Sequence, residues 1–402
     1  MQMAKCLMIS AIFAELSVFF MMRIIIIFLS VAMAMSCSGP QPLPRDNWND
    51  DAYDVLCGLI SGEGKMSDGY DPGCRPYAVF DFDNTTVMND ISLTLMIYQV
   101  ENMRFAFPPD EAFAAFTAWL PDIDTIMTGV GMSAAQIGRE LVEDYRFLCS
   151  RMDDGMSLSD LHSTEEYLDF RAKIFALNDG IENTFDYGTW CLWMPALFTG
   201  MTYSELQALV RESVDHWMSE GRIWSEHWVS PDGKVSSDVL KGLVLPKESI
   251  NLYKTLADNG FDVYICSASL EAIVEVMASD PKYGLGIAPE RVFGIRLEDE
   301  EKVGGPFATG YDQTFLEGKT ACIMRFIAPL HCNKAPSLVA GDSNGDYDML
   351  TAFGKQGVGL IIDCERSGPI AELVSDASLP CSDNSRRYIV QKRDLSIPGY
   401  VR

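Results

Sequence analysis

Short apolar runs alternate with helix-like stretches in the second half of the chain. Apolar runs of four to six residues, bounded by polar or turn residues, are typical of buried strands, whereas longer stretches with a three-to-four-residue period predict helices. Regular alternation of the two indicates a parallel sheet covered by helices on both faces. The predicted helices are 249–259, 270–278, 319–329 and 346–353, and the predicted strands are 261–266, 292–297, 337–340 and 358–362.

One further strand precedes a long helical region. The apolar run 77–82 predicts a buried strand, and a short helix is predicted before it, over 52–60. From about residue 90 to about residue 244 the pattern is helical, without strand-helix alternation. Thr202 and Glu205 form a capping box at the start of one such helix, and Gly221 closes its end.

These patterns predict an α/β fold with a Rossmann-like, three-layer core. The core comprises 77–90 together with 245–402, and a helical cap over 91–244 is inserted after the first strand. An N-terminal leader with the short helix occupies 38–76, and 1–37 is a signal segment.

The front of the chain resembles a bacterial export signal. Met21, Met22 and Arg23 precede the apolar run 24–35, which ends at Ser36-Cys37. Small residues before a cysteine resemble a lipoprotein cleavage site, which predicts a lipid anchor on Cys37 and a location in the bacterial cell envelope. A plain secretory signal or an uncleaved anchor is the alternative.

The charge balance narrows the range of partners. The 402 residues include 57 acidic and 31 basic ones, for a formal net charge of −26. Nucleic acids and anionic membrane surfaces require a basic face, so neither is an expected partner, and contact with a membrane is expected only through the lipid. An acidic protein that binds phosphate must supply positive charge locally, through a metal ion, a lysine or helix N-termini.

Cysteines and histidines give no metal-site pattern. Nine cysteines follow the signal, without CxxC spacing, and most are expected to be buried thiols. Cys57 with Cys74 is the first disulfide pairing to test. The four histidines, at 162, 216, 227 and 331, lack zinc-site spacing and are expected in structural or surface roles.

Four short motifs follow predicted strands or open predicted helices. They are Asp81-Phe82-Asp83-Asn84-Thr85, Ser267, Lys319 in Glu317-Gly318-Lys319-Thr320, and Gly341-Asp342-Ser343-Asn344-Gly345-Asp346. Taken singly, each is a weak signal, and the structural alternative is a set of turn residues and helix caps. In this order they resemble the four signature motifs of the haloacid dehalogenase superfamily. The cap position is similar to that of the phosphoserine and phosphorylcholine phosphatase branch, with a C1-type helical cap.

The resemblance implies a covalent mechanism for phosphate ester hydrolysis. Asp81 would be the nucleophile and Asp83 the general acid and base, while Thr85 orients the loop. Ser267 and Lys319 would bind and neutralise the phosphoryl group.

The resemblance also implies a magnesium ion. Mg²⁺ would be held by Asp81, the main-chain carbonyl of Asp83, and Asp342, and Asp346 would hold a metal-bound water. The implied partner is a small phosphorylated metabolite, phosphoserine-like or phosphorylcholine-like.

Asp83 favours an ester hydrolase over other members of the superfamily, because ion pumps carry threonine at that position and dehalogenases lack an acid there. A phosphomutase retains the aspartate and is one alternative. A non-catalytic envelope lipoprotein with the same fold is another.

Two departures from the related phosphatases bear on specificity. Gly345 stands where phosphoserine phosphatases place an asparagine, and Ser92 and Leu93 stand where the phosphorylcholine branch has a glutamate facing the trimethylammonium. Aromatic residues of the cap form either a cage for a cationic group or ordinary core, and core packing is favoured. These are Trp190, Trp193, Trp217, Trp224 and Trp228; the charged cap candidates for substrate contact are Glu101, Arg104, Arg146 and Arg151.

Overall fold

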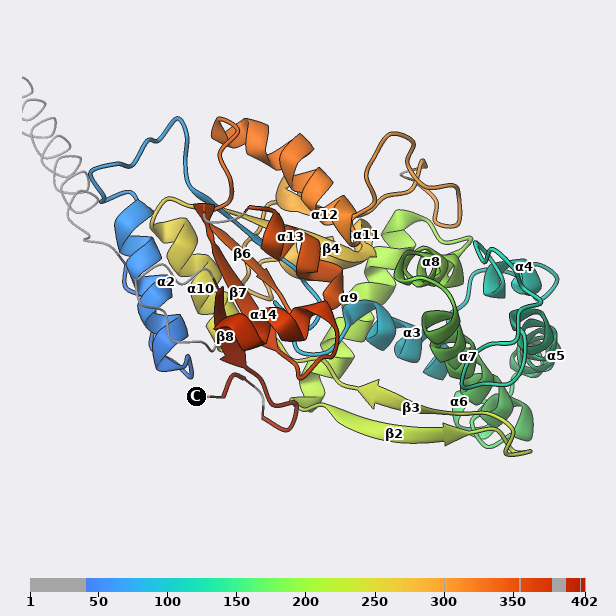
Figure 1. Ribbon diagram of the computed structural model, residues 1–402. Coiled ribbons are helices and arrows are strands. Elements are labelled where there is room, and N and C mark those ends of the chain that lie inside the picture. The colour runs from blue at the N-terminus through green and yellow to red at the C-terminus, as the bar shows by residue number, and fades with distance from the viewer. Residues whose placement is uncertain (1–40, 300, 354–355, 378–387, 398, 402) are drawn as a thin grey trace, which may run out of the picture. The chain divides into compact units, whose positions relative to one another are not determined.

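The structure is a computed structural model that describes residues 41–299, 301–353, 356–377, 388–397 and 399–401 (Figure 1). The predicted signal over 1–37 and its Cys37 therefore lie outside the described residues. The chain from Pro42 onward forms one compact unit. Among the helices of the described ranges, none combines the length and the apolar character needed to cross a membrane.

Six parallel strands form one sheet in the order β5-β4-β1-β6-β7-β8 (Figure 1). This arrangement confirms the predicted Rossmann-like α/β core. The strands are β1 (Tyr77–Phe80), β4 (Asp262–Leu270), β5 (Val292–Ile295), β6 (Leu338–Gly341), β7 (Val358–Asp363) and β8 (Tyr388–Lys392).

Both faces of the sheet are buried. In β1, Tyr77 and Val79 pack into one apolar cluster while Ala78 and Phe80 pack into another, because successive side chains of a strand point to opposite faces. The first cluster lies under α12, α13 and α14, and the second lies under α2, α10 and α11. Their bounds are α2 (Asp50–Glu63), α10 (Lys247–Asp258), α11 (Glu271–Ser279), α12 (Glu317–Cys322), α13 (Tyr347–Ala352) and α14 (Pro369–Ala377).

Strand order determines where a site forms. From β1 the chain proceeds to β4 and β5 on one side, and later to β6, β7 and β8 on the other. The order therefore reverses between β1 and β6, and in such sheets a crevice opens beyond the carboxyl ends of these two strands. Asp81 directly follows β1 and Asp342 directly follows β6.

The stretch between β1 and α10 is mostly helical, as predicted, but it also contains a hairpin that the helical reading missed. The hairpin strands pair in antiparallel fashion, and they lie beside α3 and α7 (Figure 1). The division into core and cap stays a prediction. The elements are α3 (Ile91–Glu101), α4 (Ala112–Phe116), α5 (Ala134–Asp153), α6 (Leu158–Leu161), α7 (Glu165–Thr184), α8 (Tyr187–Trp193), α9 (Tyr203–Glu220), β2 (Trp224–Val229) and β3 (Ser236–Lys241).

The structure confirms both predicted ends of helix α9. Helix α9 starts with the capping box of Thr202 and Glu205, and it ends at Gly221 in the left-handed conformation with φ 62°. The predicted helix 319–329, by contrast, is broken. Helix α12 ends at Cys322 and continues as a π-helical turn, Ile323–Ile327, and a 3-10 turn, Ala328–His331, because Pro329 has no backbone N–H to continue a ladder.

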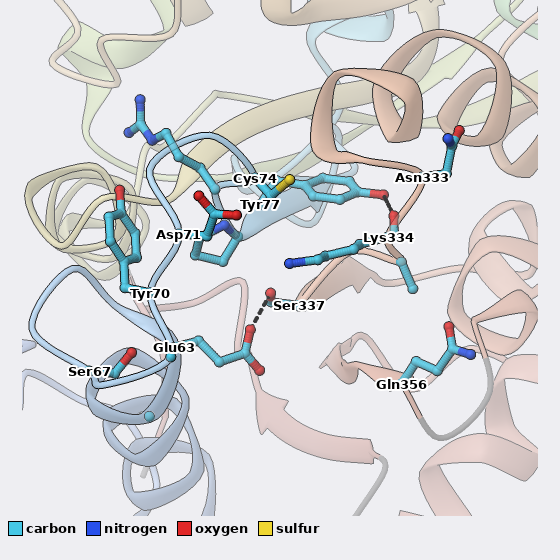
Figure 2. A pocket seen from close by; sticks show the side chains of 15 residues that line it. Glu63, Ser67, Tyr70, Asp71, Cys74, Tyr77, Asn333, Lys334, Ser337 and Gln356 are labelled. Carbon is cyan, nitrogen blue, oxygen red and sulfur yellow. Dashed lines mark hydrogen bonds between the residues drawn. The ribbon is translucent and has the colours of Figure 1, made fainter.

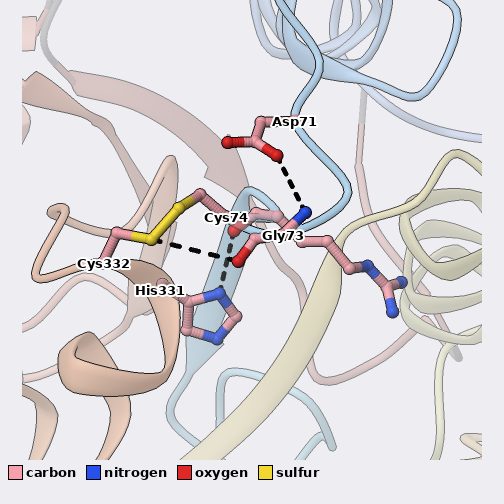
Figure 3. The surroundings of a disulfide bond; sticks show 6 residues. Asp71, Gly73, Cys74, His331 and Cys332 are labelled. Atoms are coloured by element: carbon pink, nitrogen blue, oxygen red, sulfur yellow. Dashed lines mark hydrogen bonds between the residues drawn. A yellow bond between two sulfur atoms is a disulfide. The ribbon is translucent and has the colours of Figure 1, made fainter.

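A disulfide joins Cys74 to Cys332, which corrects the expected pairing of Cys57 with Cys74 (Figure 3). Cys57 is a free, half-buried thiol on α2. Beside the disulfide, the buried ring of His331 bonds the carbonyl of Arg75 at 2.8 Å and the hydroxyl of Tyr264 at 2.9 Å. The bridge therefore ties the segment before β1 to the segment before β6.

We expect loss of this disulfide to destabilise the fold, since it closes a loop of 258 residues. Replacement of Cys74 and Cys332 by serine should lower the free energy of unfolding by about 2 to 5 kcal/mol. Urea denaturation of the oxidised wild type, the reduced wild type and the double variant measures this. Equal stability of all three would contradict the assignment.

Candidate active site

Asp81 is fixed by the sheet. It is 5% exposed at the end of β1. The backbone amide of Asp81 donates to the carbonyl of Ala340 at 2.9 Å, and its carbonyl accepts a 2.6 Å bond from the hydroxyl of Thr86. Strand pairing thus continues one residue beyond β1, and the backbone bonds hold the carboxylate in place.

The loop after Asp81 turns through two asparagines in the left-handed conformation. φ is 58° at Asn84 and 75° at Asn89, a region that asparagine enters more easily than most residues. The amide of Asn84 donates to the carbonyl of Asn89 at 3.1 Å and closes the loop. From the C-terminal segment, Arg393 donates to the main-chain and side-chain oxygens of Asn84 at 2.6 and 2.9 Å. No sequence pattern indicated that Arg393 would bond to this loop.

Lys319 connects the first motif to the fourth. Its ammonium, on a side chain that is 2% exposed, donates to Asp81 Oδ1 and to Asp346 Oδ1, each at 2.6 Å. Gly318 permits this approach, since a Cβ there would lie 1.9 Å from the carbonyl oxygen of Gln313. Burial opposes the charge of Lys319, but the two carboxylates outweigh it and raise the pKa of the ammonium. Lys319 therefore stays protonated.

Asp342 and Asp346 have different surroundings. Asp342 accepts a 3.1 Å bond from the Thr85 hydroxyl and lies 3.5 Å from the Arg366 guanidinium. Asp346 Oδ2 accepts bonds from the amides of Asp342 and Ser343 at 3.1 and 3.0 Å. With Lys319 on its other oxygen, the Asp346 carboxylate is fully engaged by this chain. Its role as holder of a metal-bound water stays a prediction.

The site suits a divalent cation. Carboxylate oxygens of Asp81, Asp342 and Asp346 all lie within 4.8 Å of one another, and all three residues are buried. One ammonium faces these three carboxylates. Burial and then the Asp346 charge raise the pKa of Asp342 to about 6 and that of Asp81 well above its usual range. A hard cation with oxygen ligands would offset this excess of negative charge, and Asp81 and Asp342 are the carboxylates free to bind it.

Asp83 lies in the loop after β1, and its carboxylate contacts the first turn of α3. Its Oδ1 accepts a 2.7 Å bond from the amide of Ile91, and its Oδ2 accepts a 2.7 Å bond from the hydroxyl of Ser269. Burial, followed by the charges of Asp90 and Asp81, raises the pKa of Asp83 well above its usual range. A carboxyl in this setting is suited to carry a proton near neutral pH.

Ser267 is fully buried in β4. Its hydroxyl accepts a 3.1 Å bond from the amide of Ser269. The pairing of β1 with β4 ends at Phe80 and Ile265, so Asp81 and Ser267 both lie just beyond the residues that these two strands pair. Its predicted contact with phosphate stays a prediction.

A cavity of about 400 Å³ opens at this edge of the sheet. Asp81, Asp83 and Asp342 line it from the core, while Tyr187 and Trp190 line it from α8. Four predicted residues are buried and are not among the lining residues: Thr85, Ser267, Lys319 and Asp346. The cavity wall also contains Ser92, which the sequence marked as a departure from the phosphorylcholine branch. Further wall residues are Asp90, Glu182, Ser269 and Arg366, to which sequence reasoning assigned no role.

A second cavity, of about 390 Å³, lies near the amino ends of β1 and β6 (Figure 2). There Glu63 accepts a bond from Ser337, and the Tyr77 hydroxyl donates to the carbonyl of Lys334. None of the four motifs contributes a lining residue. The chemistry-bearing residues converge on the first cavity, so we assign the candidate active site to it.

The tryptophan cage of the cap already holds a cation of the chain. The Lys241 ammonium lies 5.6 to 6.0 Å from the ring centroids of Trp217, Trp224 and Trp228. It also forms ion pairs with Glu101 at 2.7 Å and Glu226 at 2.9 Å. This cluster is structural, as the core-packing prediction favoured. Trp193 is fully buried, and among the five cap tryptophans only Trp190 lines the cavity.

The other charged cap candidates lie outside the cavity lining. Arg104 pairs with Glu212 and Arg146 pairs with Asp110, while the guanidinium of Arg151 lies over the ring of Phe147.

The two departures from related phosphatases have structural explanations. Asn344 bonds the carbonyl of Ser367 and the amide of Ile370 at 2.9 and 3.0 Å, so it holds the start of α14. Ser92 donates to Ser269 at 2.8 Å. Neither residue substitutes directly for the side chain that the related enzymes carry.

We expect Lys319→Met to destabilise the fold because it leaves Asp81 and Asp346 buried together without a counter-charge. The expected loss in unfolding free energy is about 3 to 5 kcal/mol at neutral pH without added metal. Chemical denaturation measures it, with Lys254→Met, an exposed lysine on α10, as the matched control. A loss no greater than that of the control would contradict the ionic role.

Comparison with known proteins adds one named relative. No family model matches the chain. The chain is similar to phosphorylcholine phosphatase of Pseudomonas aeruginosa (strain PAO1), at 27% identity over 197 residues, 42% of this chain and 54% of the relative. The match thus spans about half the length of that curated relative.

Two solved structures of unknown function are also similar. One, from Anaerococcus prevotii DSM 20548, is 29% identical, has a TM-score of 0.79 and covers 89% of this chain and 96% of its own. The other, from Bordetella pertussis Tohama I, is 14% identical and has a TM-score of 0.40. The match covers 79% of this chain and 98% of that protein. The parallel core with its four motifs and the similarity to a phosphatase support a resemblance of this chain to the phosphatases of the haloacid dehalogenase superfamily.

Proposed function

We propose that the protein is a magnesium-dependent phosphomonoester hydrolase that works through an aspartyl-phosphate on Asp81. The observation that carries the proposal is a buried carboxylate that is paired with an ammonium and lines the same cavity as a second carboxyl. Lys319 contacts Asp81 at 2.6 Å, and Asp83, which is two residues away in sequence, shares the cavity wall with Asp81. A purely binding protein has no use for a proton donor beside a buried nucleophile.

In the first step, a carboxylate oxygen of Asp81 forms a bond to phosphorus while the bond from phosphorus to the substrate oxygen breaks. The leaving oxygen takes the proton of Asp83 and departs as an alcohol. Lys319 offsets the negative charge that gathers between Asp81 and the phosphoryl group.

In the second step, a water molecule attacks phosphorus and the bond to Asp81 breaks, which releases inorganic phosphate. Asp83, now a carboxylate, accepts a proton from this water, so both residues return to their starting states. When bound at Asp81 and Asp342, Mg²⁺ would reduce the repulsion between nucleophile and phosphate. Asp346 and Thr85 hold Lys319 and Asp342 for both steps.

A cationic alcohol is the proposed leaving group. The cavity volume of about 400 Å³ suits a small metabolite. Glu182 lines its wall, and the positive charge of Arg366 on the same wall attracts its carboxylate. Trp190 stands on the same wall. An ammonium group, which phosphorylcholine and phosphoserine share, would pair with this side of the cavity.

Export to the bacterial envelope remains part of the proposal, with a lipid on Cys37 as the tether. The disulfide between Cys74 and Cys332 supports an oxidising compartment. The excess of acidic residues argues against a nucleic-acid partner.

Hydrolysis of p-nitrophenyl phosphate tests the activity itself. We expect turnover with Mg²⁺, loss of turnover on chelation, and recovery when Mg²⁺ is restored. Asp81→Asn should lower kcat by at least about 10³-fold, because an amide cannot form the acyl-phosphate. Folded wild type without turnover, or an active Asp81→Asn variant, would refute the hydrolase and leave the non-catalytic alternative. In a separate assay with a sugar phosphate, transfer of the phosphoryl group to a second hydroxyl of the sugar in place of release of inorganic phosphate would indicate a phosphomutase.

Glu182→Gln tests the cationic leaving group. We compare kcat/KM for phosphorylcholine and for its neutral isostere 3,3-dimethylbutyl phosphate. The preference for the cation should fall about fivefold, equivalent to a partly exposed charge pair of about 1 kcal/mol. Glu220→Gln, at an exposed position at the end of α9, is the matched control. An unchanged preference in the Glu182 variant would exclude this role.

A further inference from the structure

Ser92, Ser269 and Asp83 form a chain of hydrogen bonds that ends at the proposed general acid, Asp83. Ser92 Oγ donates to Ser269 Oγ at 2.8 Å, and Ser269 Oγ donates to Asp83 Oδ2 at 2.7 Å. Both serines are buried, at 5% and 8% exposure. Since each hydroxyl has one proton, the direction of the chain fixes Asp83 as the final acceptor.

The three residues come from separate parts of the fold. Asp83 belongs to the loop after β1, Ser269 to the end of β4, and Ser92 to the first turn of α3. The other oxygen of Asp83 accepts from the amide of Ile91, also in the first turn of α3. Both oxygens of the Asp83 carboxyl therefore accept a hydrogen bond. The Ile91 amide and the Ser92 hydroxyl, which acts through Ser269, both belong to the first turn of α3.

We infer that Ser269, itself oriented by Ser92, is the positioning residue that aims Asp83 at the leaving oxygen of the substrate. This inference rests on the proposed hydrolase. Proton transfer requires the donor within hydrogen-bond reach of its target. A carboxyl with only the Ile91 amide bond can rotate about its side-chain bonds, whereas a second bond from Ser269 limits that rotation. Successive hydrogen bonds also polarise one another and strengthen the last one.

The choice of substrate separates this role from a structural one. A p-nitrophenolate leaving group delocalises its own negative charge and gains little from a proton donor. An alkoxide, such as that from phosphorylcholine, gains a great deal. Since kcat/KM covers the steps through formation of the aspartyl-phosphate, it reports the protonation of the leaving group without the later attack of water.

The central experiment measures kcat/KM of Ser269→Ala on phosphorylcholine and on p-nitrophenyl phosphate. On the alkyl ester we expect kcat/KM to fall about 10- to 100-fold. This is part of the rate enhancement of about 10²- to 10⁴-fold that a correctly positioned general acid contributes. On the aryl ester the loss should stay below about threefold. Ser269→Thr retains the hydroxyl in an extended strand that accepts a β-branched residue, so it should restore most of the alkyl activity.

Two further variants keep the test decisive. Ser92→Ala removes only the outer link and should give a smaller loss with the same selectivity for the alkyl ester. Ser213→Ala removes another buried serine hydroxyl, on α9 and outside the cavity lining, and should leave the ratio of the two substrates unchanged.

Equal losses on both esters in folded Ser269→Ala, or no loss on either, would overturn the positioning role while the hydrolase stands. If wild type hydrolyses neither ester, the proposed function fails and this inference fails with it.

Discussion

The buried contact of Lys319 with Asp81 and Asp346 is the constraint on which the rest of the site depends. Charges inside a protein are tolerated only when they are paired, and here one ammonium serves two carboxylates at 2.6 Å each. The third carboxylate, Asp342, lies within the same cluster. The arrangement fixes Asp81, the proposed nucleophile, and it retains a surplus of negative charge that would favour the binding of a cation.

The fold brings these groups together through strand order. Asp81 and Asp342 come from neighbouring strands, β1 and β6, whose carboxyl ends meet at the point where the order reverses. The disulfide and His331 fasten the chain near the opposite ends of the same two strands. Close backbone packing completes the geometry, since a Cβ at Gly341 would lie 2.4 Å from Cβ of Asp346. Strand pairing and this close packing therefore set the positions of Asp81 and Asp342 at the ends of β1 and β6.

The sequence was most informative where residue type and backbone pattern coincide. Apolar runs predicted strands β1, β4, β5, β6 and β7, and the acidic residues after two of them predicted the cluster of Asp81 and Asp342. Hairpin β2–β3 was missed because charged residues interrupt its alternation, and β8 was missed because its short strand ends in Gln391 and Lys392. Cys332 and Ser269 were missed for another reason. Their partners are 258 and 186 residues away, and no local pattern encodes such a distance.

The support of Asp83 explains why the inserted helices and the chemistry belong together. Asp90 caps α3 by accepting a hydrogen bond from the amide of Leu93 at 2.8 Å. The amide of Ile91, in the same turn, donates to Asp83. The first turn of α3 therefore donates hydrogen bonds both to its own cap residue and to Asp83. A shift of α3 relative to β4 would stretch the bonds of Asp83 to Ile91 and of Ser92 to Ser269 together, because both start from the same turn. Contacts that fix α3 against the sheet therefore also fix the orientation of Asp83. If Asp83 is the proton donor proposed above, substrate contacts made by the helices between β1 and α10 would affect the reaction as well as binding.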